Sequence, residues 1–407
     1  MSARELQSTT SRQLQAEAIV DDLPEPNYPI NYQPTYPSRA GLVSGVAELL
    51  NTSGVTTLEN IQAVRHDLVP VGDPEDKTIM LISGGCREAI RLQTPVRELA
   101  LRSQRTVQIA QSSKVESLYV VERGRGQYKK PRSEFEEEDE NGNLVPVYMG
   151  DIVNGMDFSD RTPDPSRLVA GGLQARDLEE ILSEIMGGHI PAAHEALSLA
   201  YEQAFIEPHP DPRSVRDYSI SGDILWGGLR TNKIGSAVLE LLKRLDNPVG
   251  VKIDATCDED HIAYIADTLN PEEEEGKLLY MLRLGQKDSD QYVPILKHIK
   301  EHAPTSIVLF DTHGMTEKIT VDGKVRKIRH IPTIIRHMNI MGEACLEAGV
   351  KFGGAHLETM VDEYEFECTD ERHPEPTRDG NLDPQANPNQ TVRLLNAMSD
   401  INDRQFA

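Results

Sequence analysis

Four residues with metal-ligating side chains follow or lie in short apolar runs. Cys86 comes directly after TIMLISGG, His313 lies in SIVLFDTHG, Glu358 in GGAHLE and Asp383 in NLDPQAN. One thiolate, one imidazole and two carboxylates suit a borderline divalent ion such as Mn²⁺, Fe²⁺, Co²⁺ or Zn²⁺, with a position left open for a substrate. Taken singly, each has an ordinary structural explanation as a buried cysteine, a capped core histidine or a surface carboxylate. The residues predict a metal site only if the fold brings them together.

Several cationic residues lie in or beside apolar runs, where an unpaired charge is costly. They are Arg123, Lys130, Arg230, Lys252 and Arg283. Structural salt bridges with the chain's own carboxylates are one explanation. The other is a site for one or two phosphorylated metabolites, because the guanidinium fork matches the geometry of phosphate. The residues alone leave both explanations open.

The segment VERGRGQYKKPRS, residues 121–133, concentrates cations in an acidic chain. The 407 residues include 42 Lys and Arg and 66 Asp and Glu, which gives a formal net charge of −24. Such a charge disfavours nucleic acids and anionic membranes as partners, but it allows a small basic pocket. Two cations of the segment, Arg125 and Lys129, are expected to face solvent or nearby acidic residues.

The elements that would position these residues alternate along the chain from about residue 78. Short apolar runs are separated by amphipathic patterns such as SAVLELLKRL and EDHIAYIADTL, which is typical of parallel βα units. Seven or eight such units over about 300 residues favour an α/β fold of the (β/α)8 TIM-barrel type over an open sheet. The carboxyl ends of barrel strands converge on one mouth, where active sites are built. No GxGxxG motif follows the first strand, which argues against a dinucleotide site.

The first part of the chain lacks this alternation of apolar runs and amphipathic patterns. We predict an N-terminal arm with accessory helices over residues 1–75 and the barrel over residues 76–407. The arm contains LPEPNYPINYQPTYPS, whose prolines exclude a regular helix or a central strand. The segments AGLVSGVAELLN and TLENIQAVRHDL follow, and both have the pattern of helices packed on a later core.

Apolar runs and cysteines indicate the compartment. No run approaches the roughly 18 residues needed to span a membrane, and the start MSARELQSTTSRQLQ lacks the apolar region of a signal peptide. The four cysteines, Cys86, Cys257, Cys345 and Cys368, form no CxxC motif. We therefore expect a cytoplasmic protein whose cysteines are free thiols or ligands.

Eleven motifs together resemble the class II 3-deoxy-D-arabino-heptulosonate 7-phosphate (DAHP) synthase family. They keep the family's order between about residues 78 and 395: GGCREA, VERGRGQYKKPRS, YMGDIVNG, AHEALSLAYE, WGGLRTN, NPVGVK, RLG, THGMT, HLETM, FEC and DPQAN. The resemblance implies a (β/α)8 barrel with N-terminal additions. It also implies condensation of phosphoenolpyruvate with erythrose 4-phosphate, with release of phosphate, in a shikimate-type or secondary-metabolite pathway.

The resemblance implies roles residue by residue. The metal ligands would be Cys86, His313, Glu358 and Asp383, around one divalent ion, with Mn²⁺ or Co²⁺ expected ahead of Zn²⁺ or Fe²⁺. Phosphoenolpyruvate would meet Arg123, Arg230, Lys252 and Arg283. The aldose phosphate would lie against Lys130, Pro131, Arg132 and Ser133, with Asn154 near its hydroxyls. Lys130 or a metal-bound water would supply the proton, and Cys86 and His313 would act in catalysis as ligands. The family also implies a homo-oligomer, a dimer or tetramer.

Some positions depart from the family pattern. Gly85, Met149, Leu229 and Asn232 replace an Asp, an Arg, a Glu and an Arg, and Asp223 replaces a His. The helices that carry allosteric sites in longer members are also lacking between NGMD and AHEAL. The departures leave open a different aldehyde acceptor, such as an amino-sugar phosphate. A non-catalytic paralogue that binds metabolites or regulates a partner enzyme is the remaining hypothesis.

Overall fold

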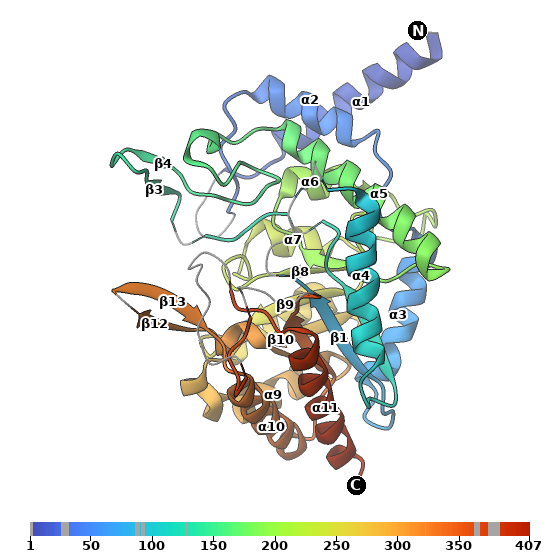
Figure 1. Ribbon diagram of the computed structural model, residues 1–407. Helices are drawn as coiled ribbons and strands as arrows, with labels where there is room; N and C mark the ends of the chain where they lie inside the picture. Colours follow the sequence, from blue (N-terminus) through green and yellow to red (C-terminus); the bar gives the residue numbers. More distant parts are fainter. Residues whose placement is uncertain are drawn as a thin grey trace.

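The structure is a computed structural model. It describes residues 3–25, 32–85, 90, 94–126, 128–132, 134–321, 323–361, 367–372 and 383–407. A barrel forms its centre, helices surround the barrel, and the first two helices of the chain lie at one end (Figure 1). Of the N-terminal helices, α1 (Ala3–Asp21) projects outward, while α2 (Arg39–Leu49) and α3 (Leu58–Gly72) lie on the body.

Eight parallel strands form one sheet in the order β2-β1-β14-β11-β10-β9-β8-β5. They are β1 (Ile79–Gly84), β2 (Leu118–Glu122), β5 (Ala193–Glu195), β8 (Ile224–Gly227), β9 (Val249–Ile253), β10 (Leu278–Leu282), β11 (Ile307–Asp311) and β14 (Gly354–Glu358). The two edges meet where the Glu122 N–H donates to the Pro191 carbonyl at 2.9 Å, beside a parallel bridge between Glu122 and Ala192. The predicted (β/α)8 barrel is confirmed.

Each strand is followed by a helix, as a right-handed parallel barrel requires. The helices are α4 (Val96–Gln111), α5 (Ser166–Met186), α6 (Leu199–Ala204), α7 (Ala237–Lys243), α8 (Glu259–Leu269), α9 (Tyr292–His302), α10 (Ile331–Ala348) and α11 (Pro388–Gln405). Side-chain caps set several of their starts. The Asp258 carboxylate accepts from His261 N at the start of α8, and Asn387 and Gln390 form a capping box at the start of α11.

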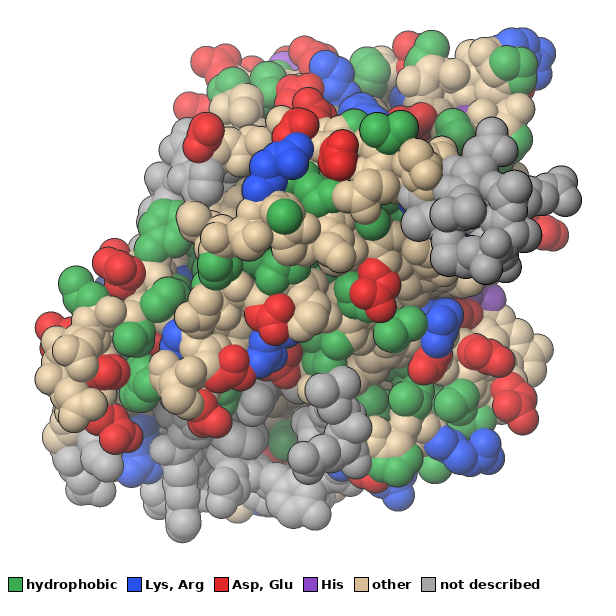
Figure 2. All heavy atoms as spheres, turned by 90° about the horizontal axis from the view of Figure 1, so that it is seen from above, with side chains coloured by type: hydrophobic (Ala, Val, Ile, Leu, Met, Phe, Trp, Pro, Cys, Tyr) green, Lys and Arg blue, Asp and Glu red, His purple; other side chains and the backbone are tan. Residues whose placement is uncertain are grey.

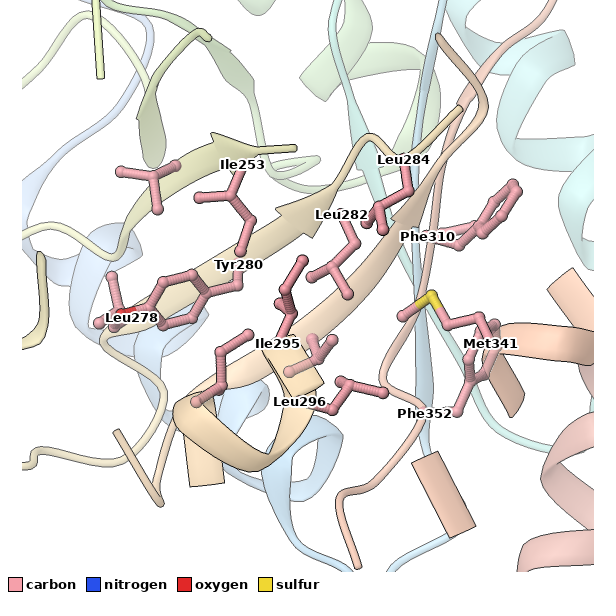
Figure 3. Close-up of a cluster of buried hydrophobic side chains, with 14 of the residues drawn as sticks. Ile253, Leu278, Tyr280, Leu282, Leu284, Ile295, Leu296, Phe310, Met341 and Phe352 are labelled. Carbon is pink, nitrogen blue, oxygen red and sulfur yellow. The ribbon is translucent and has the colours of Figure 1, made fainter. Parts of the chain in front are cut away.

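Alternate residues of the strands belong to two hydrophobic clusters, because side chains along a strand point to opposite faces. The outer cluster lies between strands and helices: Ile253, Leu278, Tyr280, Leu282 and Phe310 pack against helix residues such as Ile295, Leu296 and Met341 (Figure 3). The inner cluster fills the barrel with the other set, including Met80, Val121, Trp226, Met281 and Leu309. On the strands that contribute to the inner cluster, the next inward residue lies two positions beyond the last member of that cluster. These next inward residues are therefore the ones that reach the mouth.

The N-terminal segment packs on both ends of the barrel. Val64, Leu68 and Val71 of α3 belong to the inner cluster. Residues of α2 join a second core with side chains from later in the chain, among them Tyr128 and Met149. The division into residues 1–75 and 76–407 stays a prediction, and these contacts cross it.

Short antiparallel hairpins interrupt the βα order. They pair β3 (Glu136–Glu138) with β4 (Leu144–Pro146), β6 (Ile206–Glu207) with β7 (Tyr218–Ser219), and β12 (Glu317–Val321) with β13 (Lys324–Ile328). The β3–β4 and β12–β13 hairpins project from the body (Figure 1). The predicted acidic loop at 134–143 thus includes a hairpin strand.

Charge is dispersed on the face that Figure 2 shows. Acidic and basic side chains are interspersed there, and apolar side chains are scattered among them.

The helices that the structure describes are each too short or too polar to cross a bilayer.

Gly354 allows β14 to approach β1, and its replacement provides a test of this packing. Its φ is 126°, and a Cβ at this position would lie 2.0 Å from the Met80 backbone oxygen. Backbone atoms cannot move aside cheaply, so we expect Gly354→Ala to lower the free energy of unfolding by more than about 2 kcal/mol. Urea unfolding measures the change. Gly188→Ala is the control, because an added Cβ there meets nothing within 4 Å; equal stability of the two variants would contradict the packing argument.

Candidate active site

The carboxyl ends of the strands bring ionisable side chains together at the mouth. Arg123 continues the inward set of β2, Lys252 that of β9, Asp311 that of β11, and His356 and Glu358 that of β14. Strand register places Asp311 opposite His356 and Gly84 opposite Glu358. Residues that are far apart in sequence therefore meet because the sheet closes.

Asp311 is the fully buried carboxylate at the centre of this group. One oxygen lies 2.6 Å from His313 Nδ1 and 3.3 Å from His356 Nδ1, and the other lies 3.1 Å from Lys252 Nζ. Burial by itself would raise its pKa, but His313, Lys252 and His356 outweigh burial and hold the pKa well below its usual range. Asp311 is therefore an anion that joins two histidines to a lysine.

His313, Glu358 and Asp383 offer donor atoms that all lie within 4.8 Å of one another. His313 sits in the 3-10 turn η3 (Thr312–Met315) after β11, and its Nε2 is 2.7 Å from Glu358 Oε1. This donor set and spacing fit one borderline divalent ion. Three of the four predicted ligands therefore lie together. The fourth, Cys86, lies outside the described residues, shortly after the strand that pairs with Glu358.

Two cations stabilise the carboxylates of this group. Arg329 contacts Glu358 Oε2 and lies 3.3 Å from Asp383 Oδ2, while Lys327 Nζ lies 2.8 Å from Asp383 Oδ1. Burial opposes ionisation of Glu358, but His313 and Arg329 hold its pKa well below the usual range. Burial likewise opposes ionisation of Asp383, and Arg329 and Lys327 lower its pKa despite the nearby Glu358. Both carboxylates are thus kept in the form that binds cations.

A second group of cations lies beside Trp226 on β8. The Arg123 guanidinium lies 5.6 Å and the Lys252 ammonium 5.8 Å from the centre of its ring, within cation–π range. Arg123 NH1 is also 2.8 Å from His356 Nε2. Burial, Lys252 and Arg123 together hold the pKa of His356 well below its ordinary value, so the ring is neutral and accepts from the guanidinium. Burial also lowers the pKa of Lys252, partly opposed by Asp311.

The remaining predicted phosphoenolpyruvate cations follow neighbouring strands. Arg230 comes three residues after β8 and Arg283 directly after β10, and both side chains are half-buried. Arg123 and Arg283 each lower the pKa of Lys252, which places them within electrostatic reach of it. A strand-end set of cations thus surrounds the neutral His356 and the anionic Asp311.

Residues 130–132, which are predicted to hold the aldose phosphate, lie along residues 148–149. Lys130 N donates to the Met149 carbonyl at 2.7 Å, and Arg132 Nε donates to the Tyr148 carbonyl at 2.7 Å. The Asn154 amide accepts from Met149 N and donates to two backbone carbonyls, so it fixes this pair of segments. Ser133 lies outside the described residues, and the substrate contacts of the loop stay a prediction.

Arg125 and Lys129 do not face solvent, so that alternative was wrong for both. Arg125 is fully buried and pairs with Glu122 at 3.2 Å and with Glu179, which confirms its acidic partners. Lys129 Nζ is buried and donates to the backbone carbonyls of Tyr32 and Leu197, at 2.8 and 2.9 Å. Both cations hold the scaffold behind the loop rather than an exposed patch.

The sequence prediction assigned no role to four residues of the site: Trp226, Asp311, Arg329 and His356. The phase of each strand could have found three of them. Because Lys252 and Glu358 were placed at the mouth, the same two-residue period selects Asp311 after Leu309, and His356 two residues before Glu358. Trp226 is the inward residue of β8. Arg329 follows the β12–β13 hairpin, and no strand period applies to it.

Comparisons with known proteins agree with this geometry. Residues 25–190 and 179–396 match the model of the class-II DAHP synthetase family. A phospho-2-dehydro-3-deoxyheptonate aldolase of Streptomyces coelicolor is 27% identical over 395 residues, covering 82% of this chain and 86% of the relative. One of Neurospora crassa is 27% identical over 407 residues, covering 82% and 83%.

A solved structure is similar in fold. The phospho-2-dehydro-3-deoxyheptonate aldolase of Francisella tularensis superposes with a TM-score of 0.54 and 14% identity, over 96% of each chain. At that identity the likeness concerns the fold.

Buried Lys129 predicts a pH dependence of stability. Burial lowers its pKa to about 7, partly opposed by Glu195 and Glu202. Between pH 7 and the pKa of an unfolded lysine, about 10.4, the unfolded chain binds more protons, so this group makes stability rise with pH by up to about 1.4 kcal/mol per unit. Lys129→Met should remove that slope.

Urea unfolding at several pH values from about 6 to 9 measures the effect of Lys129→Met against the parent chain. Lys297→Met is the matched control, because Lys297 is 56% exposed and should leave the slope unchanged. A difference between Lys129→Met and the parent that stays constant with pH would mean that Lys129 has an ordinary pKa.

Proposed function

Because the chain belongs to the class-II DAHP synthetase family, we propose that it condenses phosphoenolpyruvate with erythrose 4-phosphate to give DAHP and phosphate. The observation that supports the proposal is that a group of metal-ligating side chains and a group of cations lie next to each other at one barrel mouth. The donors of His313, Glu358 and Asp383 lie within 4.8 Å of one another, and Asp311 connects His313 to Lys252 among the cations.

The ligand set that we propose is Cys86, His313, Glu358 and Asp383, with one divalent ion, Mn²⁺ or Co²⁺ ahead of Zn²⁺ or Fe²⁺. Such an ion acts as a Lewis acid toward a carbonyl oxygen when bound. Asp311 accepts from His313 Nδ1, which fixes the ring so that Nε2 is presented to the ion. Arg329 and Lys327 hold the far sides of the carboxylates.

For phosphoenolpyruvate we propose Arg123, Arg230, Lys252 and Arg283. Its phosphate and carboxylate repel one another and the second phosphate, so a site for both substrates needs several cations. The Arg123 fork lies beside the Trp226 ring and the neutral His356. These neighbours place the guanidinium at the mouth, beside the Lys252 ammonium on the same ring.

For the aldose phosphate we propose Lys130, Arg132 and Ser133, with Asn154 near the hydroxyls. The Lys130 N–H and the Arg132 guanidinium donate to the backbone carbonyls of residues 149 and 148, and these bonds fix the loop. Asn154 holds the segment of residues 147–149 on which this loop lies, so its effect on the substrate would come mainly through loop position. Lys130 is the proton donor that we propose at the aldehyde oxygen.

The reaction balances with these groups. The methylene carbon of phosphoenolpyruvate forms a bond to the aldehyde carbon, and the aldehyde oxygen takes a proton from Lys130 to become a hydroxyl. Water adds at the former enol carbon and loses one proton, which restores the proton given by Lys130. Phosphate then leaves with cleavage of its carbon–oxygen bond and takes the proton of the new hydroxyl, so that the carbon becomes a ketone. Arg123 and Lys252 hold the charge of the carboxylate and phosphate through these steps.

The positions that depart from the family pattern bear on the acceptor. Asn232 is buried and donates to the Lys252 carbonyl at 3.1 Å. Asp223 is buried and accepts from Ala192 N at 2.7 Å, and Met149 is part of the second core. These three serve the scaffold, which favours the ordinary acceptor. Half-buried Leu229 is the departure that keeps another aldehyde as the second candidate.

An assay of the purified, metal-loaded protein tests the proposal. Phosphate release and product mass are followed with phosphoenolpyruvate and a panel of aldose phosphates. Activity with erythrose 4-phosphate and its loss in Cys86→Ser are the expected results. Activity only with another aldehyde would replace the acceptor, and no activity with any aldehyde would overturn the enzyme proposal.

Asp311→Asn tests the connection between the metal ligands and the cations. The amide cannot balance His313 and Lys252, so we expect divalent-ion affinity to fall roughly 10–100-fold and the dissociation constant of phosphoenolpyruvate to rise. Isothermal titration measures both without turnover. Asp403→Asn, an exposed change on α11, is the control. Unchanged affinities for ion and phosphoenolpyruvate would show that Asp311 has no positioning role.

A further inference from the structure

A second group of metal-ligating side chains lies on the outer helices. Glu259 begins α8, and His298 and His302 lie four residues apart near the end of α9. The Glu259 carboxylate reaches both rings: one oxygen is 3.5 Å from His298 Nδ1 and the other is 3.2 Å from His302 Nε2. One carboxylate from a neighbouring helix thus lies between two imidazoles.

The spacing on α9 is one that metal proteins use. Residues four apart lie on the same face of a helix, and residues 298–302 read H-I-K-E-H, a pattern in which both histidines of some zinc enzymes bind the ion. The donors of Glu259, His298 and Glu301 also lie within 4.8 Å of one another. These three donors are at metal-binding spacing, and His302, on the other oxygen of Glu259, is the nearby candidate for the fourth position of a four-coordinate ion.

We propose that Glu259, His298 and Glu301, with His302 as the fourth donor, form a second binding site for a divalent ion of the Zn²⁺ or Co²⁺ type. The ion would clamp α8 to α9. The inference does not rest on the proposed function, because the site uses other residues and other elements than the barrel mouth.

The electrostatic surroundings favour a cation. His302 ends α9, where the helix dipole is negative. The neighbouring lysines are directed elsewhere: Lys297 pairs with Glu347 of α10 at 3.4 Å, and Lys300 Nζ lies close to Gly349. Two carboxylate charges would balance a divalent ion. The side chains of Glu259, His298 and His302 are between 29% and 51% exposed, so an ion can enter directly from solvent.

Metal titration of the whole chain tests the proposal. Stripped protein is titrated with Zn²⁺, and bound ions are counted after dialysis. We expect two equivalents in the parent chain and one in the His298→Ala, His302→Ala double variant, together with loss of part of the Zn²⁺-induced rise in thermal midpoint. Co²⁺ distinguishes the sites, because only the barrel site is expected to contain a thiolate and to give its charge-transfer band.

Matched variants keep the result decisive. Glu259→Gln should weaken the same ion without removing a histidine, and Cys86→Ser should retain it. His66→Ala is the control, since its ring is 88% exposed and outside the group. Thermal unfolding in chelator checks that each variant folds as the parent does. If the double variant binds as many ions as the parent, or if Cys86→Ser binds none, the second site is overturned.

Discussion

The buried charge of Asp311 is the interaction on which the barrel mouth depends. An unpaired charge in the interior costs several kcal/mol or changes its protonation state. Asp311 lies within 3.3 Å of nitrogen atoms of Lys252, His313 and His356, so one carboxylate offsets the cost of several neighbours. Without it, Lys252 would lose the carboxylate 3.1 Å from its ammonium, and both histidines would lose their shared acceptor.

The closed sheet decides which side chains can share this carboxylate. Strand alternation sends every second residue inward, and parallel register aligns the ends of neighbouring strands. Asp311 therefore lies opposite His356, and Gly84 lies opposite Glu358. The Trp226 ring, 5.5 Å from the His356 ring, lies in the same inner cluster as Met281 and Leu309. The apolar interior thus ends in an aromatic surface that supports the cations.

Much of the fold and part of the site follow from local sequence. Apolar runs between amphipathic helices are enough to predict parallel βα units, and the strand ends identified Lys252, His313 and Glu358. Partner choice inside the barrel depends on register, which sequence periods do not give. That is why the contacts of Asp311 with His356 and Lys252 went unpredicted, although the strand period is enough to place these residues at the mouth.

Buried polar networks explain the cations whose surroundings were predicted wrongly. Arg125 and Lys129 belong to a segment that looks hydrophilic throughout, yet both are buried with charged or carbonyl partners. Apart from Glu122, their partners are Tyr32, Glu179, Ile190 and Leu197, which are remote in sequence. The cations of the segment 121–133 therefore fall into two groups: Arg125 and Lys129 hold the scaffold, and Arg123 lies at the mouth. Only long-range packing decides to which group a cation belongs.

The overall charge of −24 means that anions can be attracted to the mouth only by cations close to it. Phosphorylated substrates approach against a net negative field, which is screened over about 8 Å at physiological ionic strength. Attraction must then come from cations close to the site, where surrounding apolar walls reduce screening. Arg123 and Lys252 meet this condition because they are buried beside Trp226. The same burial gives Asp311 its role as a compensating carboxylate, so the proposed anion site depends on an anion of the protein itself.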